Sequence, residues 1–444
     1  YLFGKKFNKS LNVKIPSSDF NKSALLGPTP FKYDIEVFKL FIDIIFYKTT
    51  KIIIQRAINN FLSSNCVYLQ TYFFNMRLHR NLVFTVIDSI KLIFNEGEYA
   101  DKVVQKALKR DARWGARDRK FVAETIYEMV RWKRLYNEIA GTKSHYTTEN
   151  VWKNFAVFAI LKGYKLPDWN QLQDVPERRI KGKFDELQKI RVFKESIPDW
   201  LDELGVKELG EKHWSKEIEA LNMQAEVILR TNTLRTNKVS LRKKLSEEGI
   251  ETVFIDGYTD ALKLVERANV FKTKCFADGL FEVQDASSQL VAEYLDVKPG
   301  MRVIDTCAGA GGKTLHLSAL MENKGQIIAT DIYESKLKKL KIRTRRAGAH
   351  NITTKVLDSS KVIKKMKNSA DRVLIDAPCS GIGVLKRNPD SKWKLQPEFV
   401  ENIIKTQAEI LENYSQLVKV GGKMVYATCS ILPSENEQQV KAFL

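Results

Sequence analysis

Apolar residues recur every three or four positions over a long stretch that begins at Met76. The repeat is clear over residues 82–94 and again over residues 121–130. This spacing is typical of helices that bury one face, and it continues to about residue 205. The pattern predicts a small all-helical domain over residues 76–205.

A mixed pattern follows the junction Pro-Asp-Trp-Leu at residues 198–201. Short strand-like runs alternate with a helix-like run over residues 240–245 and lie near residues 227–230, 252–255 and 262–265. Such an alternation predicts a small ferredoxin-like α+β module over residues 206–284.

Strand and helix patterns then alternate regularly to the end of the chain. The predicted strands lie near residues 302–305, 327–330, 353–356, 372–375 and 423–427. Regular alternation is the signature of a mostly parallel, doubly wound sheet. We therefore predict an α/β fold with a Rossmann-like domain over residues 285–444.

The first 75 residues show no clear pattern, and no Met occurs before Met76. They represent either translated sequence upstream of the true start or an N-terminal extension, and we assign them no function. The apolar run at residues 37–54 contains four charged residues, too many for a membrane span. A signal peptide is not evident, because a charged region, an apolar core and a cleavage site do not occur together.

The chain of 444 residues carries 73 Lys and Arg against 53 Asp and Glu, a net charge of +20. Such a balance favours a polyanionic partner, most simply nucleic acid, although a general lysine bias would produce it too. Basic residues mixed with Trp114 and Trp132 in the helical domain fit RNA binding and a solvated helix face equally well. The five cysteines form no C-x-x-C pair and no zinc-site spacing, so we expect a cytoplasmic protein without a metal.

A glycine-rich turn, Gly309-Ala-Gly-Gly312, follows the first strand of the Rossmann-like domain. Glycine lets the backbone approach a ligand closely. The loop is not a P-loop, because a P-loop would require glycine at the position of Cys307. Asp331, at the end of the next strand, can accept hydrogen bonds from ribose hydroxyls. Dinucleotides and S-adenosylmethionine fit this loop equally well, but acidic residues after the next two strands, Asp358 and Asp376, favour S-adenosylmethionine.

Two cysteines occupy the ends of the fourth and fifth strands of this domain, in Asp376-Ala-Pro-Cys379 and Thr428-Cys429. In a doubly wound sheet these ends are neighbours, so the two thiols are expected close together beside the cofactor. Adding a thiolate to carbon 6 of cytosine makes carbon 5 able to take a methyl group. Loss of the carbon 5 proton and release of the thiolate then need a base and protonation control, which Asp376 and the second thiol can supply.

These motifs resemble the RsmB/Sun family of RNA cytosine-5 methyltransferases. The resemblance covers about residues 225–444 and rests on residues 305–313, Asp331, Asp358, residues 376–381, 387–390, 392–393 and 428–430. The helical region similarly resembles a NusB-like RNA-binding domain through residues 114–120. Two departures are Gly309-Ala310, where many members have Ala-Pro, and the end of the chain at Leu444, where we expect the family sheet to continue.

The resemblance implies roles for individual residues. It makes Cys429 the nucleophile and gives Cys379 a part in product release, whereas thiol chemistry alone, by analogy with the DNA enzymes, would favour Cys379. It places S-adenosylmethionine against Cys307, Ala308, Gly309, Ala310, Gly311, Gly312, Lys313, Asp331, Asp358 and Asp376.

We therefore expect a monomeric enzyme that forms 5-methylcytosine in RNA, most simply in small-subunit ribosomal RNA. Lys386, Arg387 and Lys392 are expected to contact phosphates near a flipped base, although all three fit solvated charges too. A cytosine-5 methyltransferase that acts on transfer RNA would share every one of these motifs. A non-catalytic ribosome-assembly factor would not need both thiols, and a nitrogen-directed methyltransferase would not need a thiol after the fourth strand.

Overall fold

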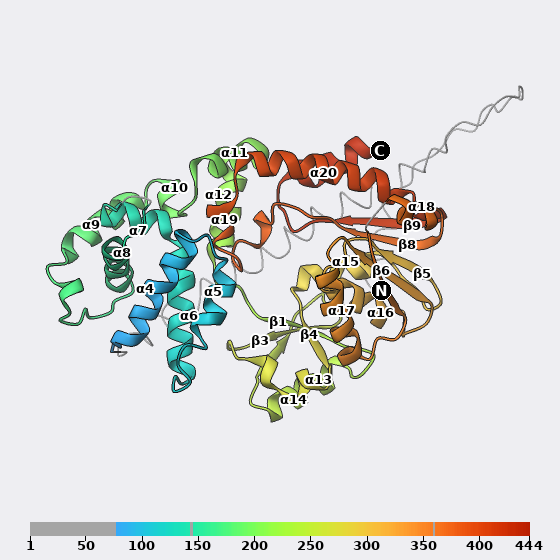
Figure 1. Cartoon of the computed structure of the whole chain (residues 1–444), viewed down its shortest axis with the longest axis horizontal. Coiled ribbons are helices and arrows are strands. Elements are labelled where there is room, and N and C mark those ends of the chain that lie inside the picture. Colours follow the sequence, from blue (N-terminus) through green and yellow to red (C-terminus); the bar gives the residue numbers. More distant parts are fainter. Residues whose placement is uncertain (1–76, 143–144, 358–359) are drawn as a thin grey trace, which may run out of the picture. The chain divides into compact units, whose positions relative to one another are not determined.

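The computed structural model describes residues 77–142, 145–357 and 360–444 (Figure 1). Its first part is helical, as predicted from the spacing of apolar residues. The helices are α4 (Arg80–Phe94), α5 (Ala100–Ala107), α6 (Ala116–Arg131), α7 (Lys133–Ala140), α8 (Thr148–Leu161), α9 (Glu177–Leu187), α10 (Arg191–Lys194), α11 (Asp199–Leu209) and α12 (Glu211–Asn222).

Helices α4, α6 and α8 supply most of the core of this helical part. On α4 the residues Leu82, Val83, Val86 and Ile90 are buried, which matches the three-and-four spacing in the sequence. Helix α8 is apolar on nearly all sides and is correspondingly buried along most of its length. The all-helical prediction is confirmed, and the likeness to a NusB domain stays a prediction.

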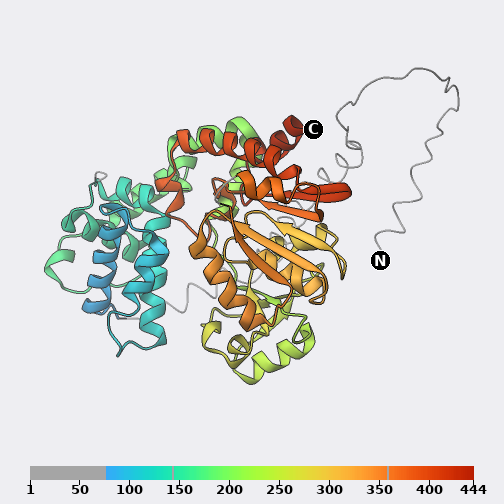
Figure 2. The same cartoon turned by 45° about the vertical axis from the view of Figure 1, so that its right-hand side comes forward.

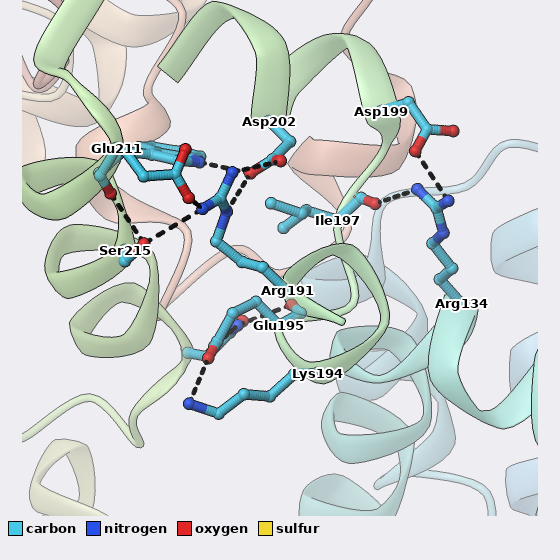
Figure 3. A network of polar contacts seen from close by, with 11 residues as sticks. Arg134, Arg191, Lys194, Glu195, Ile197, Asp199, Asp202, Glu211 and Ser215 are labelled. Carbon is cyan, nitrogen blue, oxygen red and sulfur yellow. Dashed lines mark hydrogen bonds and ion pairs between the residues drawn. The ribbon is translucent and has the colours of Figure 1, made fainter. Parts of the chain in front are cut away.

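A polar network joins α7 to the start of α11 (Figure 3). Arg134 donates to the carbonyl of Ile197 at 2.7 Å and to the carboxylate of Asp199 at 2.8 Å. Beside it, Arg191 makes a bidentate pair with Asp202, with both N–O distances 2.8 Å. Such forked pairs fix orientation as well as distance, so this network holds α7, α10 and α11 together.

The next part is a βαββαβ unit. Strands β1 (Ile228–Thr231), β2 (Thr252–Phe254), β3 (Ala261–Leu264) and β4 (Phe281–Val283) form an antiparallel sheet in the order β2-β3-β1-β4. Helix α13 (Lys238–Glu247) and the short α14 (Lys274–Ala277) are the two helical elements. This order is that of a ferredoxin-like fold, as predicted.

The last part contains a five-stranded parallel sheet in the order β7-β6-β5-β8-β9. Its strands are β5 (Arg302–Asp305), β6 (Gln326–Asp331), β7 (Ile352–Val356), β8 (Ala370–Asp376) and β9 (Val418–Ala427). All five strands were predicted, and so was the arrangement in which β8 and β9 are neighbours on one side of β5, with β8 paired to β5 and β9 paired to β8. The chain order reverses between β5 and β8, and ligands bind at such switch points.

Helices cover both faces of the parallel sheet (Figures 1 and 2). Consecutive residues of β6 point to opposite faces of the sheet. Ile327 packs toward α15 (Ala286–Tyr294) and α16 (Gly312–Leu320), whereas Ile328 packs toward α18 (Ser360–Lys365) and α20 (Pro397–Ser415). Helix α17 (Glu334–Ala347) lies on the Ile327 side, next to Ala329. After β9 the chain ends in α21 (Glu437–Phe443).

Within the described residues, no helix is long and apolar enough to cross a membrane. The apolar run at residues 37–54 and the whole of residues 1–75 lie outside the described part of the chain.

Candidate active site

The ends of β8 and β9 bring two thiols together. Cys379 and Cys429 lie 50 residues apart in sequence, yet their sulfur atoms are 3.2 Å apart. The amide N–H of Cys429 also donates to the sulfur of Cys379 at 3.3 Å. Cys429 is exposed and Cys379 is half-buried. The convergence expected from the order of the strands is therefore observed.

The two thiols differ in their readiness to ionise. A hydrogen bond from Cys379 lowers the pKa of Cys429, and the nearby ammonium of Lys313 acts in the same direction. The shared hydrogen bond and burial together raise the pKa of Cys379, which outweighs the opposing effect of the Cys429 amide. Of the two cysteines, Cys429 therefore ionises more readily to the thiolate, which is the nucleophilic form.

The other described cysteines are poor candidates for a nucleophile. Burial raises the pKa of Cys307 to about 12. Burial also raises the pKa of Cys275, in the ferredoxin-like module, to about 12. Both therefore remain thiols at neutral pH.

A charged pair lies beside the thiols. Lys313, from the first turn of α16, donates to Asp376 at the end of β8 across 2.8 Å. The two side chains are 18% and 32% exposed, so the pair faces partly open space. Asp376 can therefore accept a hydrogen bond from a ligand, and Lys313 can fix the orientation of its carboxylate.

The glycine loop between β5 and α16 has the backbone geometry of a ligand cradle. Gly309 and Gly311 have φ values of +56° and +87°, which favour glycine. A Cβ on Gly309 or Gly312 would meet no atom of the described residues within 4 Å, so the loop borders open space in this part of the chain. Asp331 accepts the N–H of Gly309 at 2.9 Å, which ties the loop to the end of β6.

The ferredoxin-like module contacts the same loop. Arg230 on β1 is buried and donates to the carbonyl of Gly312 at 2.7 Å. Arg343 on α17 donates to the carbonyl of Ala310 at 2.7 Å and pairs with Glu282 on β4. Neither arginine was predicted from the sequence to contact this loop, although Arg230, an arginine inside an apolar strand, is a recognisable signal of a buried partner.

Two family models match the chain. Residues 292–444 match the model "16S rRNA methyltransferase RsmB/F", and residues 197–271 match the ferredoxin-like domain of RsmF/B-like methyltransferases. A probable ribosomal RNA small subunit methyltransferase B of Synechocystis is 31% identical over 404 residues, which are 82% of this chain and 88% of that protein. The chain belongs to the RsmB/Sun methyltransferase family.

Solved structures resemble this RsmB/Sun methyltransferase. The crystal structure of PH0851 superposes with a TM-score of 0.70 at 26% identity and covers 83% of this chain and 90% of its own. NSun6 from Pyrococcus horikoshii, solved with SFG, has a TM-score of 0.52 at 21% identity and covers 56% of this chain and 87% of its own. The second likeness shows the fold alone.

The residues expected to touch RNA are placed differently from one another in this family member. Lys386 is half-buried, and Arg387 pairs with Asp285. Lys392 is 1% exposed, and its ammonium donates to the side chain of Asn222 at 3.1 Å. No phosphate can reach Lys392 in this structure, so its expected contact with RNA is not supported.

The segment around Lys392 instead contacts the helical part. The carboxylate of Asp390 accepts the amide N–H of Ala100 at 3.0 Å, and the indole of Trp393 donates to the carbonyl of Val130 at 2.7 Å. These residues therefore attach the helical part to the segment that follows β8. Asp358, expected near the cofactor, lies outside the described residues.

Asp305 at the end of β5 makes the stability of this methyltransferase depend on pH. Its side chain is buried, one oxygen accepts from Thr314 at 2.7 Å, and the other has no hydrogen-bond partner among the described residues. Burial raises its pKa to about 7, whereas an unfolded chain has an aspartate pKa of about 3.9. The folded protein therefore binds the extra proton between these values, and its stability falls as pH rises from about 4 to 7.

Replacing Asp305 by Asn should remove this dependence. We expect a gain in free energy of unfolding on the order of 2 kcal/mol at pH 8, because roughly 4 kcal/mol of ionisation cost disappears and an unpaired amide restores part of it. Thermal unfolding of both proteins from pH 5 to pH 8 measures the effect. A constant difference between the two curves would contradict the assignment.

Proposed function

We propose that this chain transfers a methyl group from S-adenosylmethionine to carbon 5 of a cytosine in small-subunit ribosomal RNA. The observation that carries the proposal is the 3.2 Å contact between Cys379 and Cys429 next to the Lys313–Asp376 pair. One thiol suffices to activate the cytosine ring, and the second can assist release of the methylated cytosine from the first.

The residues around the glycine loop suit S-adenosylmethionine. Open space borders Gly309 and Gly312, where an adenosine or methionine group can approach the backbone. Asp331 uses its two oxygens to accept the N–H groups of Gly309 and Tyr333, and each oxygen keeps a lone pair for a ribose hydroxyl. When bound, S-adenosylmethionine supplies an electrophilic methyl group on a sulfonium. The solved relative NSun6 was determined with SFG, an analogue of this donor.

Cys429 is the nucleophile in this proposal. Its thiolate attacks carbon 6 of cytosine, and the electrons of the 5,6 double bond shift so that carbon 5 becomes nucleophilic. Nitrogen 3 takes a proton from water as electron density reaches it, and the carboxylate of Asp376, which Lys313 orients, accepts a hydrogen bond from the resulting N3–H. The lowered pKa of Cys429 supports this role, because it increases the fraction of thiolate at neutral pH.

Cys379 acts after the methyl group has arrived. Carbon 5 then carries both a proton and a methyl group, and the proton must leave before the Cys429 sulfur can be expelled. Once the Cys429 sulfur is bonded to carbon 6, its thiolate no longer raises the pKa of Cys379, so Cys379 can release its own proton to water. Its sulfur, which lies beside that of Cys429, can then take the carbon 5 proton, directly or through water. Elimination restores the 5,6 double bond and frees the product.

Small-subunit ribosomal RNA is the proposed substrate because the Synechocystis relative carries that substrate in its name. Transfer RNA is the alternative within the same chemistry, and a non-catalytic assembly factor is the alternative outside it. Incubation of the full chain with labelled donor and either unmodified ribosomal or transfer RNA separates them. Label in ribosomal RNA alone is expected. Label in transfer RNA alone would reassign the substrate, and RNA binding without label would favour the assembly factor.

Donor binding provides a separate prediction. Asp331→Ala removes the acceptors that we assign to the ribose, and a hydrogen bond to a charged group is worth about 1.5–3 kcal/mol, so binding should weaken by about 10- to 100-fold. Isothermal titration with S-adenosylmethionine measures this change. Glu334→Ala is the control, because Glu334 is exposed on the next helix. Equal affinities for Asp331→Ala and wild type would place the ribose elsewhere.

A further inference from the structure

A buried carboxylate connects the two cysteine loops. Glu435 lies in the 3-10 turn Pro433–Glu435 after β9 and is fully buried. One of its oxygens accepts the amide N–H of Ser380 at 2.8 Å. The other accepts the hydroxyl of Ser430 at 2.5 Å and also the hydroxyl of Ser380. Glu435 thus holds two loops that belong to different strands.

The two serines directly follow the two thiols. Ser380 is the residue after Cys379, and Ser430 is the residue after Cys429. The hydroxyl oxygens of the serines are 3.3 Å apart, which is close to the 3.2 Å between the sulfur atoms. A shift of either serine would therefore move the neighbouring cysteine, because one peptide unit joins them.

Within the part of the chain that the structure describes, only neutral groups hold Glu435 in place. Besides the serines, the amide of Gln407 donates to its carboxylate at 3.0 Å and to the carbonyl of Pro378 at 2.9 Å. No salt bridge to Glu435 is found among the residues that the structure describes. A buried carboxylate without a counter-ion is costly unless hydrogen bonds satisfy it. These donors satisfy it, and they bind the cysteine loops in doing so.

We propose that Glu435 is a positioning residue for the methyl transfer, because its carboxylate sets the separation of Cys379 and Cys429 by holding the residue that follows each of them. This inference rests on the proposed function, which gives the two thiols their roles. Glu435 touches neither the ring nor the donor in this account, and it acts only through Ser380 and Ser430.

Position and charge can be separated at Glu435 by two substitutions. Glu435→Leu keeps much of the volume but removes every acceptor. Glu435→Gln keeps an acceptor for the Ser380 amide and for Gln407, and its amide group can donate to the serine hydroxyls, which rotate to accept. The charge of Glu435 opposes ionisation of Cys429, whereas the hydrogen bond from Cys379 favours it. Glu435→Gln removes only the charge and should leave Cys429 at least as reactive as in wild type. Glu435→Leu removes the charge too, but the loss of the hydrogen bond from Cys379, which is the larger effect, should make Cys429 less reactive.

Alkylation by iodoacetamide, followed at each cysteine by peptide mass spectrometry, measures that reactivity across pH. The assay uses the full chain without RNA or donor. We expect Glu435→Leu to slow alkylation of Cys429 at pH 7 by about fivefold or more, because less thiolate is present once Cys379 moves away. Glu435→Gln should be alkylated at least as fast as wild type. In methylation assays, kcat should fall by about 10²-fold for Leu and stay within about threefold for Gln, with KM for the donor unchanged in both.

Glu437→Gln is the matched control, because Glu437 is two residues away on α21 and only partly buried. It should leave alkylation and methylation as in wild type. The same alkylation profile for Glu435→Leu and wild type would overturn the proposal. If Glu435→Leu does not fold, slower alkylation of Cys429 in Glu435→Gln would overturn it instead. Expected alkylation changes in a protein that methylates no RNA would leave the positioning intact and refute the proposed function.

Discussion

Replacing Cys429 by Ala is expected to abolish methyl transfer, with a loss of at least about 10⁴-fold in kcat. The variant lacks the thiolate that makes carbon 5 of cytosine reactive, and no other described cysteine can replace it. Cys379 is adjacent, but its pKa is raised, and the pKa of Cys307 is about 12. Transfer of labelled methyl groups from the donor to RNA over several hours measures the residual rate.

Cys275→Ala is the control for loss of a thiol. Cys275 is buried in the ferredoxin-like module, away from the ends of β8 and β9, so kcat should be unchanged. The affinity of Cys429→Ala for RNA and donor should also match that of wild type, because the substitution removes a reacting atom. A Cys429→Ala enzyme with more than about 1% of the wild-type rate would move the nucleophile to Cys379.

Replacing Cys379 by Ala is expected to trap the enzyme on its RNA. The Cys429 thiolate can still attack and the methyl group can still arrive, but the group that takes the carbon 5 proton is missing. Multiple turnover should fall by about 10²- to 10⁴-fold, which is the usual range for loss of a general base. A band containing both protein and labelled RNA on a denaturing gel detects the covalent complex.

The double variant Cys379→Ala, Cys429→Ala provides the control for this adduct. It should give no such band, because the attacking sulfur is absent. An equally strong band from the double variant would mean that another residue binds RNA covalently. A Cys379→Ala enzyme that turns over at the wild-type rate would contradict the role of Cys379 in release.

The sequence predicted most of the fold because apolar patterns reflect burial directly. All five strands of the parallel sheet were found, since runs such as Val373–Ile375 are buried on both faces. The strand β4 was not predicted. It has three residues, and its central Glu282 interrupts the apolar pattern that indicates a strand. In the structure Glu282 is nevertheless buried, and it pairs with Arg343 and Arg346. A strand whose charge is paired elsewhere in the chain gives no local signal.

Part of the site was predicted from the sequence, because local apolar patterns show where the strands end. Strand ends determine where Asp376, Cys379 and Cys429 lie, and strand ends can be found from local patterns. Partners that come from distant segments could not be found this way. Lys392 was expected at the RNA surface but is buried against Asn222, and Glu435 gave no sign that it would join two loops. Both depend on contacts between residues more than 50 positions apart.

The identity of the methylated nucleoside tests the central claim most directly. The full chain would be incubated with donor carrying a labelled methyl group and unmodified small-subunit ribosomal RNA. The RNA would then be digested to nucleosides and separated by liquid chromatography with mass spectrometry. The account predicts that the label elutes as 5-methylcytidine and disappears with Cys429→Ala. Label in any other nucleoside, or label in 5-methylcytidine that survives Cys429→Ala, would contradict it.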